Sequence, residues 1–148
     1  MKKDILTIIS ILVVILALGA YFVFAPKAPE LDYRPVDVGG GSITVEDQYD
    51  MDRVVLDATL AAPGFITIHE SMSGAPATII GTSQYLDIGT YDDLTIMLVD
   101  EMLPGYSYIT LLHADDGDGI FVIDDDLPVE VDGEVVRPDF VADPSSVR

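Results

Sequence analysis

The stretch from Val54 to Glu70, VVLDATLAAPGFITIHE, carries two consecutive segments with the pattern of β-strands. The first, 54–60, is rich in β-branched and apolar residues, and in the second, 65–70, successive side chains fall into two alternating sets. A period of two residues is typical of a strand, because successive side chains point to opposite faces of a sheet. We therefore expect two neighbouring β-strands here.

Short segments of the same kind recur along the rest of the chain, and no segment after residue 24 shows a sustained helical period. We expect strands at 43–45, 77–81, 94–98, 106–113, 119–123, 129–131 and 134–136, the last two joined by a turn at Asp132-Gly133. About seven short strands at intervals of about 8 to 12 residues indicate an all-β domain. The predicted fold is an immunoglobulin-like antiparallel β-sandwich, with an up-and-down barrel as the alternative.

The N-terminal part predicts a membrane helix. Lys2 and Lys3 precede Ile5–Phe24, which has no charged residue. As a helix, this segment spans roughly 30 Å, the thickness of a bilayer core. Positive charge before the segment places the N-terminus in the cytoplasm and the following domain outside. We expect residues 1–24 to be the anchor of a single-pass protein of the cell membrane.

Two other interpretations of this segment stay open. A cleaved signal peptide usually has a shorter apolar region, and this one ends in the bulky residues 21–24. Type IV pilins also join an N-terminal apolar helix to a β-rich head, but Lys3-Asp4-Ile5 lacks the small residue and the glutamate of their processing site. For this reason a pilin-like filament subunit is only the second alternative to our main functional hypothesis.

The residues between the apolar segment and the first strand predict a spacer. Residues 25–41, APKAPELDYRPVDVGGG, combine prolines, which favour extended backbone, with three terminal glycines. We expect a stalk at 25–41, a β-sandwich ectodomain at 42–142 and a tail at 143–148.

The composition excludes several classes of function. The chain has 26 acidic and seven basic residues, a formal net charge of −19 and no cysteine. Such a charge repels nucleic-acid phosphates, and the lack of thiols excludes disulfides, thiolate nucleophiles and thiolate metal sites. Solubility, adaptation to high salt and affinity for divalent cations each explain the acidity. Expected partners are the membrane, through residues 5–24, and other surface proteins or cell-envelope components.

One acidic stretch is a candidate ion site. Leu111–Asp126, LLHADDGDGIFVIDDD, approaches the calcium-loop pattern D-x-[DN]-x-[DN]-G, but the best register begins at Ala114 and so lacks the first ligand. Aspartate and glycine are also ordinary turn residues, and a solvated turn is the alternative. The predicted calcium ligands are Asp115, Asp116, Asp118 and Asp124.

The two histidines are a second candidate site. His69 and His113 each end a predicted strand. If these were the second and sixth strands of an immunoglobulin-like sandwich, both imidazoles would lie at the same end, near Glu70 or Asp115. Two imidazoles and a carboxylate suit zinc or iron, whereas a lone histidine is more often a structural hydrogen-bonding residue. The alternative function is thus a metal-binding protein or metal-dependent enzyme using His69, His113 and Asp115–Asp126.

Three phrases resemble a known family. They are Ala62–Glu70, Ile80–Gly89 and Tyr108–Asp115, the last ending in Leu-His-Ala-Asp. These phrases resemble an uncharacterised immunoglobulin-like domain of exported surface proteins from halophilic archaea and some deep-branching bacteria, over about residues 52–140. The resemblance implies an exported β-sandwich of unknown function and no catalytic residue. We therefore expect a membrane-anchored extracytoplasmic protein with a binding or structural role, not an enzyme.

Overall fold

The computed structural model of the chain describes residues 34–145. These residues form ten strands in three sheets and no helix, so the predicted all-β fold is confirmed. Within residues 34–145, no helix is long and apolar enough to span a membrane. The predicted anchor at 1–24, the first part of the predicted stalk and residues 146–148 lie outside the described residues.

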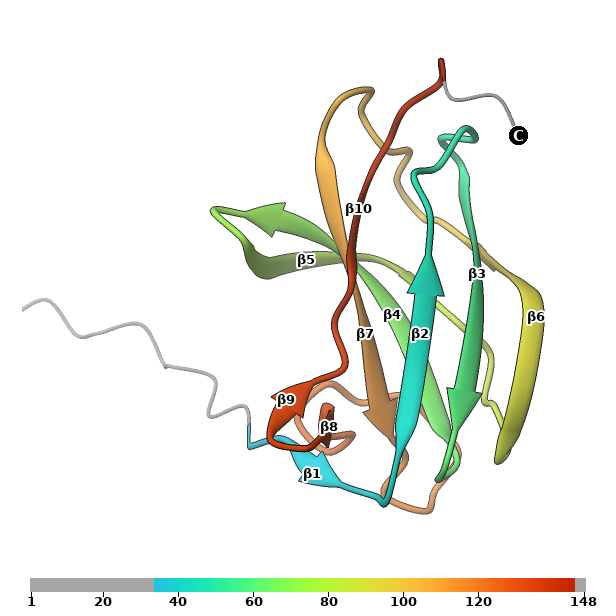
Figure 1. Cartoon of the computed structure of the whole chain (residues 1–148), viewed down its shortest axis with the longest axis vertical. Helices are drawn as coiled ribbons and strands as arrows, with labels where there is room; N and C mark the ends of the chain where they lie inside the picture. The colour runs from blue at the N-terminus through green and yellow to red at the C-terminus, as the bar shows by residue number, and fades with distance from the viewer. Residues whose placement is uncertain (1–33, 146–148) are drawn as a thin grey trace, which may run out of the picture. The chain divides into compact units, whose positions relative to one another are not determined.

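Two of the sheets form a sandwich (Figure 1). The first has the antiparallel order β2 (Gly41–Val45), β3 (Arg53–Leu60) and β6 (Gly89–Met97). The second has the antiparallel order β10 (Asp139–Val141), β7 (Ser107–Ala114), β4 (Gly64–Met72) and β5 (Ala75–Thr82). The third, small sheet joins β1 (Val36–Asp37) in parallel to β8 (Val129–Val131), which pairs with β9 (Glu134–Val135).

The sandwich core lies between the two larger sheets. Alternation along β4 places Ile66 and Ile68 on the inner face, and Leu112 on the neighbouring strand β7 lies directly opposite Ile66. Burial of these apolar side chains is the main favourable term in folding. They share one cluster with side chains of the other sheet, namely Ile43, Val54, Leu56, Ala58, Leu60 and Ile96.

The prediction of a strand at 119–123 is wrong. These residues lie in the loop between β7 and β8, and Ile120 is 65% exposed. The apolar residues in this segment have the pattern of a strand. However, the preceding aspartates accept hydrogen bonds from the loop's own backbone amides, and Gly117 and Gly119 have positive φ. The local turn chemistry therefore prevails over the apolar pattern.

Two strands were not predicted. β1 and β10 have only two and three residues, too few for a period to be recognised. β10 nevertheless completes the sheet, because Asp139–Val141 pairs with Ser107–Ile109 of β7.

Gly64 is required where β4 begins. A Cβ atom at this position would lie 1.9 Å from the carbonyl oxygen of His113 on β7. We predict that Gly64→Ala lowers the free energy of unfolding by more than about 3 kcal/mol, because the overlap is with backbone and cannot be relieved by a side-chain rotation. Gly74→Ala is the matched control: its Cβ meets no atom within 4 Å, and its φ of +79° alone costs about 1 kcal/mol. Denaturant unfolding measures both, and equal losses would contradict this account.

Candidate functional site

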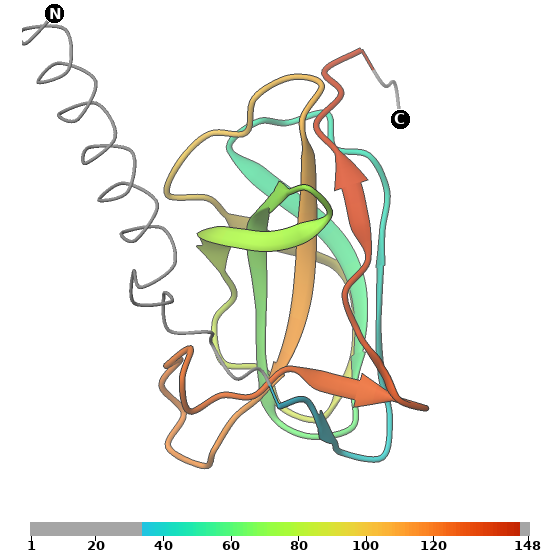
Figure 2. The same cartoon turned by 90° about the vertical axis from the view of Figure 1, so that its left-hand side faces the viewer.

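The face of β4 and β7 that points away from the sandwich core is also buried. It carries Phe65, Thr67 and His69 on β4 and Ile109, Leu111 and His113 on β7, and none of these six is more than 4% exposed. The outer face of an antiparallel sheet is commonly solvated. Here β5 runs across β4 and β7, as Figure 2 shows, and the loop after β7 supplies Phe121, whose ring packs edge-on against Phe65 and His113. This domain therefore has a second buried layer outside the sandwich.

The polar centre of this layer is a histidine pair bridged by a threonine. The Oγ1 atom of Thr67 lies 2.8 Å from Nε2 of His69 and 3.1 Å from Nε2 of His113. The other ring nitrogens reach backbone carbonyls: Nδ1 of His69 donates to Ala77 in β5 at 3.0 Å, and Nδ1 of His113 donates to Asp126 in the loop at 2.8 Å. The network thus connects the sheet to both segments that cover it.

The two histidines are brought together by a strand arrangement that differs from the expected one. β4 and β7 are adjacent and antiparallel, with Phe65 opposite His113 and His69 opposite Ile109. The two imidazoles therefore lie on the same face at different levels of the ladder, and Thr67 lies between them. The sequence analysis missed Thr67, although its position two residues before His69 places it on the same face.

Burial sets the charge preference of both rings. Desolvation lowers the pKa of His69 and of His113, while the hydrogen bonds to the backbone of Ala77 and Asp126 oppose the shift. For His113, the neighbouring His69 lowers the pKa further. A histidine with a lowered pKa stabilises the fold above its unfolded pKa of about 6.5, and this contribution is lost as the pH falls from there toward the folded pKa.

Asp126 fastens the loop after β7. It is completely buried, and its carboxylate accepts the backbone N–H groups of Val122 at 2.6 Å and Asp116 at 3.1 Å. Since its carbonyl also accepts the hydrogen bond from His113, one residue joins the loop's interior to the histidine pair. Sequence reasoning missed this role, because Asp126 is the last of three consecutive aspartates and nothing in the letters distinguishes it.

The predicted calcium ligands are only partly brought together. Carboxylate oxygens of Asp115, Asp116 and Asp118 lie within 4.8 Å of one another, while Asp124 is not part of this group. Each of the three accepts a backbone N–H of the loop: Asp115 from residues 117 and 119, Asp116 from 118, and Asp118 from 120. These turns account for the clustering, and calcium binding stays a prediction. The buried histidine pair is not part of this group.

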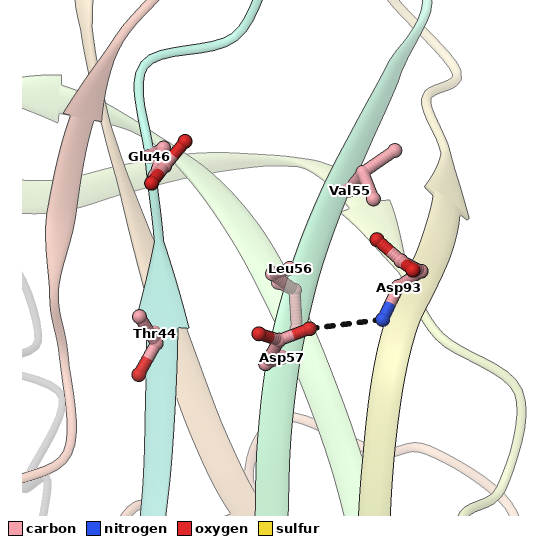
Figure 3. A pocket seen from close by; sticks show the side chains of 6 residues that line it. All are labelled: Thr44, Glu46, Val55, Leu56, Asp57 and Asp93. Carbon is pink, nitrogen blue, oxygen red and sulfur yellow. Dashed lines mark hydrogen bonds between the residues drawn. The ribbon is translucent and has the colours of Figure 1, made fainter. Parts of the chain in front are cut away.

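A second acidic feature is a pocket of about 420 Å³ on the β2-β3-β6 sheet (Figure 3). Its lining includes Glu46 after β2, Asp57 on β3 and Asp93 on β6. The backbone N–H of Asp93, which has a φ of +52°, donates to the Asp57 carboxylate at 2.9 Å, beside an irregularity in the pairing of β3 with β6. Three carboxylates lining one pocket give it a negative potential, which favours the binding of cationic groups.

The family described as "Domain of unknown function (DUF7282)" matches residues 41–142. The chain belongs to this family. Cell surface glycoprotein 2 of Haloarcula hispanica is 38% identical over 88 residues, and cell surface glycoprotein 1 of the same organism is 32% identical over 88 residues. Each match covers 58% of this chain but only 9% of the relative. No solved structure matches the chain. The predicted resemblance to surface proteins of halophilic archaea is thereby confirmed.

The role of Asp126 gives a testable consequence. In Asp126→Asn, one carboxylate oxygen becomes an NH₂ group that faces a backbone N–H, so one hydrogen bond of this buried side chain is lost. We predict a loss of about 2 kcal/mol in unfolding free energy and faster hydrogen exchange at the amides of Asp116 and Val122. Asp125→Asn is the matched control, because Asp125 is exposed and directly precedes Asp126 in the same turn. Unchanged exchange at these two amides in Asp126→Asn would show that the carboxylate does not hold the loop.

Proposed function

We propose that the chain is a membrane-anchored, extracytoplasmic module of the cell surface, with a binding or structural role and no catalytic activity. Its similarity to two cell surface glycoproteins of a halophilic archaeon carries this proposal. The matched region is a small fraction of each relative, so the inference concerns a shared module and not the activity of the whole relatives.

The strand order supports an immunoglobulin-like topology for this module. Two packed antiparallel sheets have the orders β2-β3-β6 and β10-β7-β4-β5. In immunoglobulin-like sandwiches, consecutive strands likewise alternate between two sheets through Greek-key connections. Here the chain passes from β3 to β4, from β5 to β6 and from β6 to β7 by changing sheet each time. Such sandwiches commonly serve as cell-surface domains.

The charge supports a surface exposed to strong salt. A formal net charge of −19 gives a small domain considerable self-repulsion, which a high ionic strength screens. Among the described residues, Asp126 is the only buried acidic side chain, so the excess of acids lies mainly on the surface. An acidic surface of this kind suits a binding role toward cationic groups of other envelope components, and residues 5–24 suit anchoring in the membrane.

Exposure on intact cells tests this proposal. The full chain with a C-terminal epitope tag is produced in a haloarchaeal cell, and intact cells are treated with a protease. We predict that the tag is digested, that the undigested chain sediments with membranes, and that deletion of residues 1–24 leaves the tag protected inside the cell. The same tag on a cytoplasmic protein is the control for lysis. A protected tag on the full chain would refute an extracytoplasmic domain, and recovery in the medium would refute the anchor.

A further inference from the structure

The bridge between His69 and His113 contains one hydrogen too few when both imidazoles are neutral. Each Nδ1 faces a carbonyl oxygen, which only accepts, so each ring carries its hydrogen on Nδ1. Both Nε2 atoms are then acceptors, and both face the Thr67 hydroxyl, which has a single hydrogen to donate. One buried nitrogen would therefore face an oxygen lone pair without a hydrogen between them, which is unfavourable because that nitrogen has no water to replace the missing hydrogen bond.

We infer that the folded domain has a buried site for one proton, which His69 and His113 share through the hydroxyl of Thr67. With one imidazole charged, every donor meets an acceptor. The Ala77 carbonyl accepts from His69, the charged His69 donates from Nε2 to Thr67, Thr67 donates to Nε2 of His113, and His113 donates to the Asp126 carbonyl. The chain of hydrogen bonds runs without interruption from β5 to the loop.

The effect of one ring on the other assigns the proton to His69. Burial lowers the pKa of both rings, and His69 lowers the pKa of His113 further, so the first proton goes to His69, at a pH below the usual histidine range, and leaves His113 neutral.

A second proton does not fit the site. Both Nε2 atoms would then carry hydrogens directed at the same hydroxyl oxygen, and the Thr67 hydrogen would lose its acceptor. The two charged rings would have centroids 6.5 Å apart in apolar surroundings. Uptake of the second proton is therefore linked to release of the covering loop or of β5.

Few other ionisable groups act on the pair. β5 carries none, and β7 carries His113 and Tyr108, whose side chain belongs to the sandwich core on the other face. From the loop, Asp126 favours charge on the adjacent ring. Farther out on the same side, Arg137 and Leu111 line one pocket. The exposed Asp139 of β10 lies opposite Ile109 of β7. Among the described residues, Asp126 is thus the only buried acid, and it acts on the pair from the side of His113.

Nitrogen NMR of the imidazole rings tests the inference directly. The full chain is kept in detergent with a chelator, which prevents a metal from taking the place of the proton, and the ring ¹⁵N shifts are followed from about pH 8 to about pH 5. We expect Nε2 of His69 to become protonated while the fold is retained, and Nε2 of His113 to stay unprotonated until unfolding. Protonation of both rings in the folded state, or of neither before unfolding, overturns the one-proton site.

A pair of Thr67 variants gives an independent measurement. Thr67→Val keeps the shape but removes the bridging hydroxyl, whereas Thr67→Ser keeps the hydroxyl. If the bridge binds one proton, the difference in denaturation midpoint between wild type and Thr67→Val widens as the pH falls from about 8 to about 5. For Thr67→Ser, the difference from wild type stays constant over the same range. A constant difference for Thr67→Val would show that the hydroxyl has only a structural role and would overturn the proposal.

Discussion

The hydrogen bonds of Thr67 to His69 and His113 allow both faces of the central strand pair to be buried. An antiparallel sheet that is covered on both sides has to satisfy every polar group on its outer face without help from water. In this domain the outer face of β4 and β7 presents three buried polar side chains, Thr67, His69 and His113, and each of their ring nitrogens and the hydroxyl has a partner within the protein. β5, which also pairs with β4 as the edge strand of the sheet, accepts a hydrogen bond from one histidine, and the loop accepts one from the other.

The aspartate-rich loop has a structural explanation at two levels. Three acids that are partly or fully exposed, Asp115, Asp116 and Asp118, form turns by accepting backbone N–H groups two to four residues ahead. Its buried acid, Asp126, closes the loop from inside and supplies the carbonyl for His113. The same residue type thus performs two tasks in one stretch, and the difference lies in burial alone.

The two-residue period of the side chains and the turn residues predicted most of the strands, because alternation in segments such as 54–60 and 65–70 is a local property of the sequence. They failed at 119–123, where side-chain capping prevails over an apolar pattern, and at β1 and β10, which are too short to show a period. The candidate site was harder to predict from the sequence than the strands were. His69 and His113 stood out as rare residues, but Thr67 and Asp126 acquire their roles only from the pairing of β4 with β7, which no local pattern determines.

The central claim is that the two histidine rings hold β5 and the loop on the outer face of the sheet through Nδ1–H hydrogen bonds to Ala77 and Asp126. The most direct measurement is the solvent exchange rate of the two Nδ1–H protons in the folded chain at neutral pH. Our account predicts that both protons are observed by NMR and exchange much more slowly than those of an exposed imidazole, because both rings are at most 1% exposed. Rapid exchange at either ring would contradict it.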